Sequence, residues 1–151
     1  MHNHEPEGYD CPFCRLLRTG ESPLPVEIVH RDDEVVVAIN PRWWPNNPGA
    51  CLVVPVAHHE NLYDLPDELG TPIQRAARRT AVAMKAAFGC DGVSTRQHNE
   101  PAGNQDVWHF HLHVFPRWEG DQLYSSTRPD WAPAEQMAER AAQLRAAWPP
   151  P

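Results

Sequence analysis

The sequence predicts an α+β fold, in which an antiparallel sheet of about five strands carries one long helix on one face. Five short segments combine β-branched or alternating apolar residues with turn residues at their ends, as strands do. From Ile73 to Phe88, apolar residues recur every three or four positions, which is typical of an amphipathic helix. An alanine-rich segment from Pro133 to Trp148 predicts a C-terminal helix.

The strands are expected at residues 26–30, 35–39, 51–55, 93–99 and 108–116. The first two form a hairpin across the turn at residues 31–34. Cys51–Pro55 is apolar on both faces, which favours a central position in the sheet. The loop from Pro41 to Gly49 contains Trp43 and Trp44. We expect these rings to close the core, to contact a second subunit or to form the wall of a site for a flat ligand.

The long helix should end near Phe88, because Gly89 favours a C-terminal cap. Its start is ambiguous in the sequence. Residues 71–74 resemble a capping box with Pro72 at the first helical position, but an earlier start near Asp67 is equally compatible.

A chain of 151 residues suits one domain, here taken as 1–151, with a substantial core. The net charge of -7 argues against non-specific nucleic-acid binding. No apolar run approaches the roughly 18 residues of a membrane span, so we expect no membrane partner. Residues 1–5 lack a basic-then-apolar signal pattern, so we expect a cytoplasmic protein without a disulfide framework.

The most informative stretch is Trp108–Pro116, where histidine alternates with apolar residues. On a strand, one face would carry Trp108, Phe110, Leu112 and Val114, and the other would carry His109, His111 and His113. Same-face neighbours lie about 6.6 to 7 Å apart, whereas zinc–nitrogen bonds are only about 2.0–2.1 Å long. The three histidines therefore line a pocket, or one serves a metal while another serves the chemistry.

Cys11-Pro12-Phe13-Cys14 has the spacing of half a zinc site or of a dithiol redox motif. No strand is predicted before it, as a thioredoxin-like motif would require. The four cysteines include no second pair of this spacing, so a zinc ion would need two ligands from elsewhere.

Three stretches resemble the histidine-triad superfamily of nucleotide hydrolases and transferases. Gln105–Arg117 is similar to the family's alternating histidines after a glutamine-containing turn, and Gly49–His58 resembles its second block. The cysteine pair resembles a zinc-containing bacterial branch. Together these stretches make residues 11 to about 117 the expected core, with a polar and loose tail at 1–10 and a C-terminal extension at 118–151.

The resemblance implies catalytic roles for His111, His113 and His109. His111 would be the nucleophile, which attacks the α-phosphorus of a nucleotide and forms a nucleotidyl-histidine that water then resolves. A nucleophilic imidazole needs one unprotonated nitrogen. We predict that the other nitrogen of His111 donates to a backbone carbonyl, because the triad spacing leaves no carboxylate beside it.

The resemblance also implies the substrate-binding residues. Together with His113, Gln105 and the backbone near Asp106 would hold phosphate oxygens. Asn99 matches a polar position beside that pocket, and Asn40 matches the position that hydrogen-bonds ribose. Asp106 replaces a residue that is usually small and hydroxyl-bearing. The loop after Asn40 is about two residues longer than usual.

In zinc-bearing relatives, the ligands are two cysteines, the histidine after the Pro-x-x sequence and the first triad histidine. Here these are Cys11, Cys14, His58 and His109, with His59 as a rival to His58. This closed set implies structural zinc, and the motif requires no catalytic magnesium.

The expected function is hydrolysis or transfer at the α-phosphate of a purine nucleotide derivative, by a homodimer. One alternative is a nucleotide-binding regulatory protein with weak or no turnover, which Ala50 favours because the family normally has histidine there. A second alternative is a zinc-stabilised interaction module that uses the Trp-rich loop.

Overall fold

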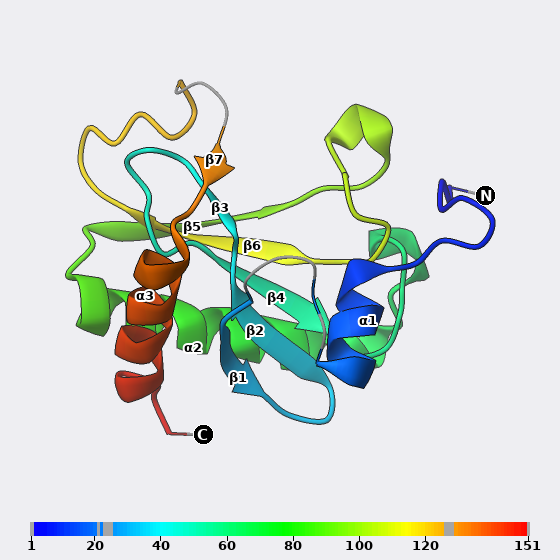
Figure 1. Cartoon of the computed structure of the whole chain (residues 1–151), viewed down its shortest axis with the longest axis horizontal. Helices are drawn as coiled ribbons and strands as arrows, with labels where there is room; N and C mark the ends of the chain where they lie inside the picture. The colour runs from blue at the N-terminus through cyan, green and yellow to red at the C-terminus, as the bar shows by residue number, and fades with distance from the viewer. Residues whose placement is uncertain (1, 21, 23–25, 126–128, 151) are drawn as a thin grey trace.

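The computed structural model describes residues 2–20, 22, 26–125 and 129–150. Within them, an antiparallel sheet has the strand order β1-β2-β4-β6-β5 (Figure 1). Its strands are β1 (Ile28–Arg31), β2 (Val35–Ile39), β4 (Cys51–Pro55), β5 (Gly92–Gln97) and β6 (Leu112–Arg117). A smaller sheet pairs β3 (Arg42–Trp43) with β7 (Asp130–Trp131). The central position predicted for Cys51–Pro55 is confirmed.

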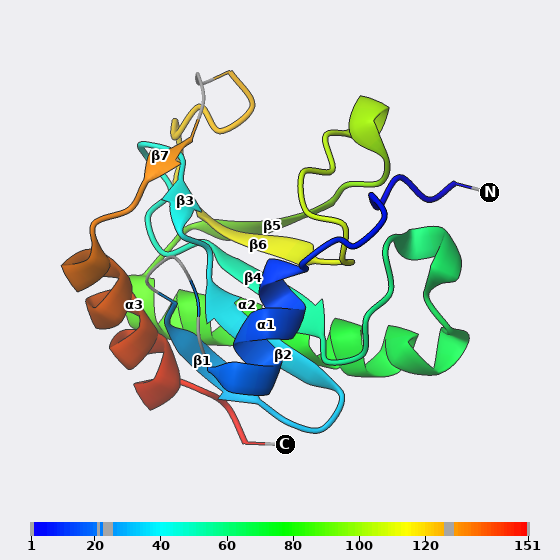
Figure 2. The same cartoon turned by 45° about the vertical axis from the view of Figure 1, so that its right-hand side comes forward.

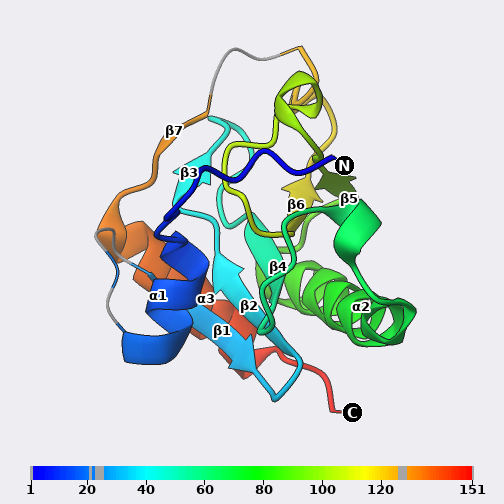
Figure 3. The same cartoon turned by 90° about the vertical axis from the view of Figure 1, so that its right-hand side faces the viewer.

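The helices are α1 (Pro12–Thr19), α2 (Gly70–Phe88) and α3 (Ala134–Ala146), with short 3-10 turns at Leu62–Asp64, Asp67–Leu69 and Pro101–Gly103. Seen from the side, α1 and α2 lie on opposite sides of the sheet (Figure 3). The predicted α+β fold, with its long helix and its C-terminal helix, is confirmed. No helix among the described residues has the length and apolar character needed to cross a bilayer.

The start of α2 follows the earlier of the two alternatives. A 3-10 turn at Asp67–Leu69 leads directly into Gly70, and no side chain caps the helix. Pro72 is tolerated because the first turn contains amides that have no helical acceptor. At the other end, Gly89 has φ 60° and donates its N–H to Lys85 O at 3.2 Å, which confirms the predicted cap.

The core lies between α2 and one face of the sheet. Its members include alternate residues of β2 and β4 together with α2 and α3 residues: Val35, Val37, Ile39, Cys51, Val53, Ile73, Ala77, Met84, Met137 and Leu144. Because side chains alternate along a strand, Val36, Ala38, Leu52 and Val54 face the other side. On that side α1 crosses in front of the sheet (Figure 2).

Strand β6 is shorter than the predicted strand at 108–116, because it begins at Leu112. Residues 108–111 form a bent lead-in whose amides bond outside the ladder. His109 N–H donates to Val107 O at 2.9 Å, and Phe110 N–H donates to His59 O at 2.6 Å. His109 and His111 are both buried, at 0% and 4% exposure, and of the three histidines only His113 lies within β6.

The Trp-rich loop is anchored by the C-terminal extension. Strand β3 pairs with β7, and Ala132 N–H donates to Pro41 O at 2.9 Å. Trp43 is buried in the core, whereas the partly buried ring of Trp44 contacts Phe115 edge-on. The two tryptophans therefore have different roles, the first as core and the second as a wall.

The N-terminal tail, which the sequence predicts to be loose, contacts the rest of the molecule from residue 2 onward. Asn61 Nδ2 donates to His2 O at 3.2 Å, and Glu60 accepts the amide of His4 at 2.5 Å. The sequence does not predict these contacts, because the tail is polar and its partners are polar residues far along the chain. Met1 lies outside the described residues.

Asp121 joins the end of β6, the segment that follows it and the loop after β3. Its carboxylate accepts Arg117 Nε and Nη2 at 2.6 and 2.8 Å and Asn47 Nδ2 at 2.7 Å. The amides of Trp118 and Leu123 also donate to it. The Arg117 guanidinium, helped by these donors, holds the pKa of the Asp121 carboxyl well below its usual range. A residue in the extension thus fixes the end of β6 to the loop after β3.

We expect Asp121→Asn to lower the free energy of unfolding by about 2–4 kcal/mol at pH 7, because it leaves the partly buried guanidinium of Arg117 without its counter-charge. A carboxyl with a depressed folded pKa stabilises the fold above its unfolded pKa of about 3.9 and loses that contribution as the pH falls through the folded value. The difference in free energy of unfolding between wild type and variant, measured by urea denaturation, should therefore narrow below about pH 4. A gap that is independent of pH, or that equals the gap for the exposed control Asp33→Asn, contradicts this account.

Candidate active site and metal centre

A cavity of about 650 Å³ lies on the sheet face opposite α2, between the sheet and α1. One row of cross-strand neighbours forms part of its floor, since Ala38 pairs with Leu52, Leu52 with His113 and His113 with Arg96. Directly paired residues in an antiparallel sheet share a face. The register therefore brings an apolar surface and a histidine into the same cavity.

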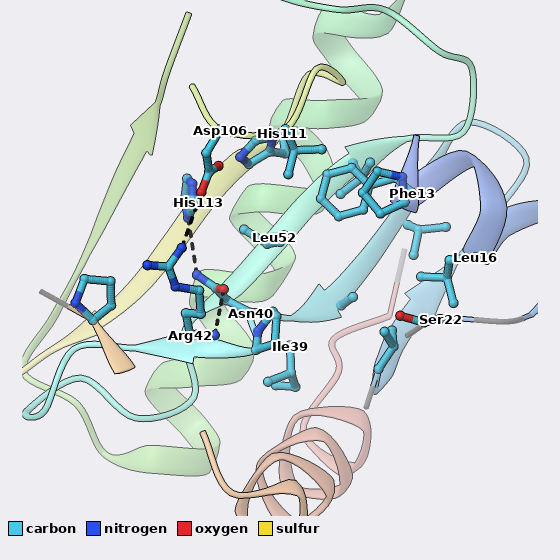
Figure 4. A pocket seen from close by; sticks show the side chains of 18 of the residues that line it. Phe13, Leu16, Ser22, Ile39, Asn40, Arg42, Leu52, Asp106, His111 and His113 are labelled. Atoms are coloured by element: carbon cyan, nitrogen blue, oxygen red, sulfur yellow. Dashed lines mark hydrogen bonds and ion pairs between the residues drawn. The ribbon is translucent and has the colours of Figure 1, made fainter. Parts of the chain in front are cut away.

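The two ends of the cavity differ in chemistry, as Figure 4 shows. At one end, Phe13 and Leu16 of α1 line the cavity together with Leu52 of the sheet. This end is apolar and suits a flat ring.

At the other end, polar side chains converge. They are Asn40, Arg42, Asp106, His111 and His113 in Figure 4, with Arg96 and His98 also in the lining. An elongated ligand with an aromatic part and an anionic part would match both ends.

His111 presents one nitrogen to this cavity. Its Nδ1 lies 2.8 Å from the backbone oxygen of His109, and a carbonyl can only accept, so Nδ1 carries the proton. The predicted carbonyl partner is confirmed. Nε2 keeps its lone pair and has no hydrogen bond from the part of the chain that the structure describes. Burial lowers the pKa of His111, which favours the neutral ring.

His113 stands beside it, with ring centroids 5.0 Å apart. Asn40 Nδ2 lies 3.5 Å from His113 Nδ1, and the orientation of the amide is set because Asn40 Oδ1 accepts Arg42 N–H at 3.1 Å. Nδ1 is thus the acceptor and Nε2 carries the proton. Burial, together with the neighbouring His111, lowers the pKa of His113 to about 3, so the ring is neutral near pH 7. A neutral N–H remains available for an anionic oxygen.

His109 points away from the cavity. Its ring is fully buried, with Nε2 2.9 Å from Pro55 O and Nδ1 3.4 Å from Cys11 Sγ. Because Nε2 must donate to that carbonyl, the lone pair of Nδ1 faces the cysteines. Burial lowers the pKa of His109 to about 4, which also favours this neutral form.

Four side chains converge around that lone pair. The ligand atoms of Cys11, Cys14, His58 and His109 all lie within 4.8 Å of one another. Cys14 Sγ lies 3.2 Å from His58 Nδ1 and 3.6 Å from His109 Nδ1. A tetrahedral zinc ion with ordinary bond lengths would set sulfur and nitrogen about 3.5 Å apart. The donor set and its spacing therefore fit zinc.

Helix α1 and its cap build half of this cluster. Cys11 is the N-cap residue, and its sulfur accepts the Cys14 amide at 3.5 Å. Burial raises the pKa of the Cys11 thiol to about 11, so a metal must displace its proton to bind. The cluster contains His58 rather than His59, whose carbonyl accepts the Phe110 amide.

The structure does not bring every predicted substrate residue to the cavity. Asn99 Oδ1 accepts the Leu62 amide at 2.8 Å, and its Nδ2 donates to Gln97 at 2.7 Å. Gln105 is buried, donates to Glu60 O at 2.6 Å and accepts the Glu100 amide at 2.9 Å. Both amides hold the shape of the loop, and neither residue lines the cavity.

Two other predicted residues do line the cavity. Asn40 lies on its floor, and Asp106 lies at its edge with a weak ion pair to Arg42 at 3.5 Å. Ala50 is fully buried in the core, so the position that resembles a family histidine contributes no polar group here.

Several lining residues are not predicted from the sequence. His98 donates from Nδ1 to Gly103 O at 2.7 Å and meets His113 edge-on with ring centroids 5.4 Å apart. Phe13 packs its ring against His111 at 5.5 Å. The pairing of β7 with β3 places Trp131 in the lining of the cavity. Only the position of Phe13 inside the cysteine motif offered a local signal.

Comparison with known proteins agrees with this geometry. The HIT domain family model matches residues 21–120. An uncharacterised HIT-like protein of Methanocaldococcus jannaschii is 34% identical over 113 residues, which cover 74% of this chain and 81% of that protein. Adenosine 5'-monophosphoramidase HNT1 of Saccharomyces cerevisiae is 31% identical over 107 residues, or 71% of this chain and 62% of that protein. Adenylylsulfatase HINT3 of Arabidopsis thaliana is 29% identical over 117 residues, which cover 78% of this chain and 57% of that protein.

Two solved structures have the same fold at higher coverage. A Hit-like protein from Bartonella henselae, described as involved in cell-cycle regulation, has a TM-score of 0.78 and 34% identity over 91% of this chain and 96% of that one. A zinc-bound histidine triad family protein from Mycobacterium smegmatis has a TM-score of 0.76 and 31% identity over 91% of this chain and 92% of that one. The match of the domain model, the fold and the alternating histidines together show that the chain belongs to the HIT family.

Proposed function

We propose that the protein is a nucleotide hydrolase or nucleotidyltransferase that acts at the α-phosphate of a purine nucleotide derivative, with His111 as the nucleophile. The observation that carries the proposal is the tautomer of His111. Its proton is held on Nδ1 by the His109 carbonyl, and its Nε2 lone pair faces a cavity with an apolar end. HIT relatives named as a phosphoramidase and an adenylylsulfatase support the reaction class.

In the first step, the Nε2 lone pair forms a bond to the α-phosphorus. The bond to the leaving group breaks, and that group departs with the electron pair and takes up a proton from water. In the second step, a water oxygen attacks phosphorus, the N–P bond breaks with its electrons returning to Nε2, and the water loses a proton to solvent. The products are the nucleoside monophosphate and the protonated leaving group.

The surrounding residues are assigned by position. The base would lie among Phe13, Leu16 and Leu52, and the ribose beside Asn40. His113 would donate its Nε2–H to a non-bridging phosphate oxygen, where negative charge develops. In the reaction itself, His109 would act by holding His111 through its carbonyl.

Ala50 still favours the alternative of a binding protein with weak turnover. The homodimer expected from the resemblance stays a prediction, which sedimentation velocity tests.

We expect wild type to hydrolyse adenosine 5'-phosphoramidate and His111→Asn to lose turnover by roughly 10³-fold or more, because asparagine has no nucleophilic nitrogen. Nucleotide binding, measured by calorimetry, should persist in the variant. His30→Asn is the matched control, since His30 stacks on Trp148 outside the cavity and should keep wild-type rates.

Residual turnover by His111→Asn close to wild type would contradict the nucleophile assignment. Wild type that binds AMP tightly but turns over no phosphoramidate would instead support the regulatory alternative.

We further propose that Cys11, Cys14, His58 and His109 hold one structural zinc ion. When bound, the ion would cross-link α1 to the end of β4 and to the segment before β6, without entering the reaction. The similarity to the zinc-bound histidine triad family protein from Mycobacterium smegmatis and the close spacing of the four ligand atoms support this zinc site.

A structural ion should stabilise the fold by about 2.7 kcal/mol at a free zinc concentration of 100 times Kd, which thermal unfolding measures. Zinc should also slow alkylation of Cys14, the partly exposed member of the pair. Cys14→Ser should lose the stabilisation, whereas Cys90→Ala, outside the cluster, should keep it. Equal zinc stabilisation of both variants would remove Cys14 from the ligand set.

A further inference from the structure

The two histidines of the cysteine–histidine cluster differ in what holds their second nitrogen. His109 Nε2 donates to a backbone carbonyl, that of Pro55. His58 Nε2 instead lies 2.7 Å from the carboxylate of Glu5, which belongs to the N-terminal tail. Both side chains are about one third exposed, at 34% each. Since a carboxylate accepts, His58 Nε2 carries the proton and His58 Nδ1 keeps its lone pair toward Cys14.

Glu5 is itself held in place from the segment that carries His58. The buried carboxylate of Glu60 accepts the backbone amides of His4 and Glu5, at 2.5 and 3.2 Å. These bonds close a ring: His58 leads along the chain to Glu60, Glu60 fixes the backbone at Glu5, and the Glu5 side chain returns to His58. A loose tail would not need a buried acceptor for two consecutive amides.

The same tail continues onto the loop that precedes the triad. His4 Nε2 lies 3.0 Å from Glu100, and Tyr9 OH accepts the Trp108 amide at 3.3 Å. Gln105 in turn donates to Glu60 O. Figure 3 shows the tail crossing beside this loop. The tail therefore links the metal cluster to the loop that carries Asp106 at the cavity edge.

We propose that Glu5 is a positioning residue of the metal site, which holds His58 in the Nε2–H tautomer and so couples docking of residues 2–10 to metal binding. The inference rests on the zinc site proposed above and goes beyond it. A carboxylate behind a histidine ligand fixes its ring orientation and raises its basicity, and losing such a partner typically lowers metal affinity about 10- to 100-fold. Linkage makes the effect reciprocal, so bound metal must also favour the docked tail.

The test compares wild type with Glu5→Ala, the conservative Glu5→Gln and the control Glu7→Ala, which removes an exposed acid from the same tail. Zinc affinity is measured by competition with a colorimetric chelator. Hydrogen exchange at the amides of His4 and Glu5 is followed with and without zinc. Long-range ¹H–¹⁵N spectra of the His58 ring report its tautomer and the lifetime of its Nε2 proton.

We expect Glu5→Ala to weaken zinc binding about 10- to 100-fold, Glu5→Gln to weaken it less because its amide oxygen still accepts, and Glu7→Ala to match wild type. Zinc should slow exchange at both amides in wild type and in Glu7→Ala but not in Glu5→Ala. The His58 Nε2 proton should exchange faster in Glu5→Ala.

Wild-type zinc affinity in Glu5→Ala overturns the proposal while leaving the zinc site intact. Unchanged amide exchange on adding zinc to wild type overturns the coupling. A wild type that binds no zinc overturns both this inference and the zinc proposal, although the assignment of His111 as nucleophile would stand.

Discussion

The candidate site depends on the position of a single residue, His109. Its side chain is fully buried and spans from the end of β4, through Nε2 and Pro55 O, to the two cysteines of the N-terminal motif. Its backbone oxygen sets the tautomer of His111. Whatever fixes residue 109 therefore fixes both the metal cluster and the direction of the His111 lone pair. A buried imidazole that lost either contact would leave an unpaired polar nitrogen in the core, at a cost of about 1–3 kcal/mol.

This arrangement separates two tasks that the sequence places side by side. Residues 109 and 111 are only two positions apart, yet one ring faces the cysteines and the other faces the cavity. The irregular segment before Leu112 allows this difference in direction. In a regular strand all three rings would lie on one face, whereas here the His109 ring points to the cysteines. Burial then keeps His109 and His113 neutral near pH 7, as a ligand nitrogen and a neutral donor require.

Much of the fold was predictable because periodicity reports local structure. The continuous apolar runs at Val35–Ile39 and Cys51–Pro55 and the apolar stripe that ends at Phe88 each produced the expected element. The bend at residues 108–111 was not predictable, because its pattern is that of a strand and the acceptors that break the ladder come from distant residues. The docked tail escaped prediction for a related reason. Glu60 and His58 lie more than fifty residues from Glu5, and the polar composition of a segment does not indicate a buried partner at such a separation.

The site was predictable to the extent that short motifs carry it. The cysteine pair, His58 and His109 converge in one cluster, and His111 and His113 line the cavity, whereas Asn99 and Gln105 shape the loop and do not line the cavity. The most direct test of the account is to quench the reaction with a phosphoramidate early and map the peptides by mass spectrometry under alkaline conditions. The account predicts a nucleotidyl adduct on His111. A quenched, active enzyme with no adduct, or with the adduct on another histidine, would contradict it.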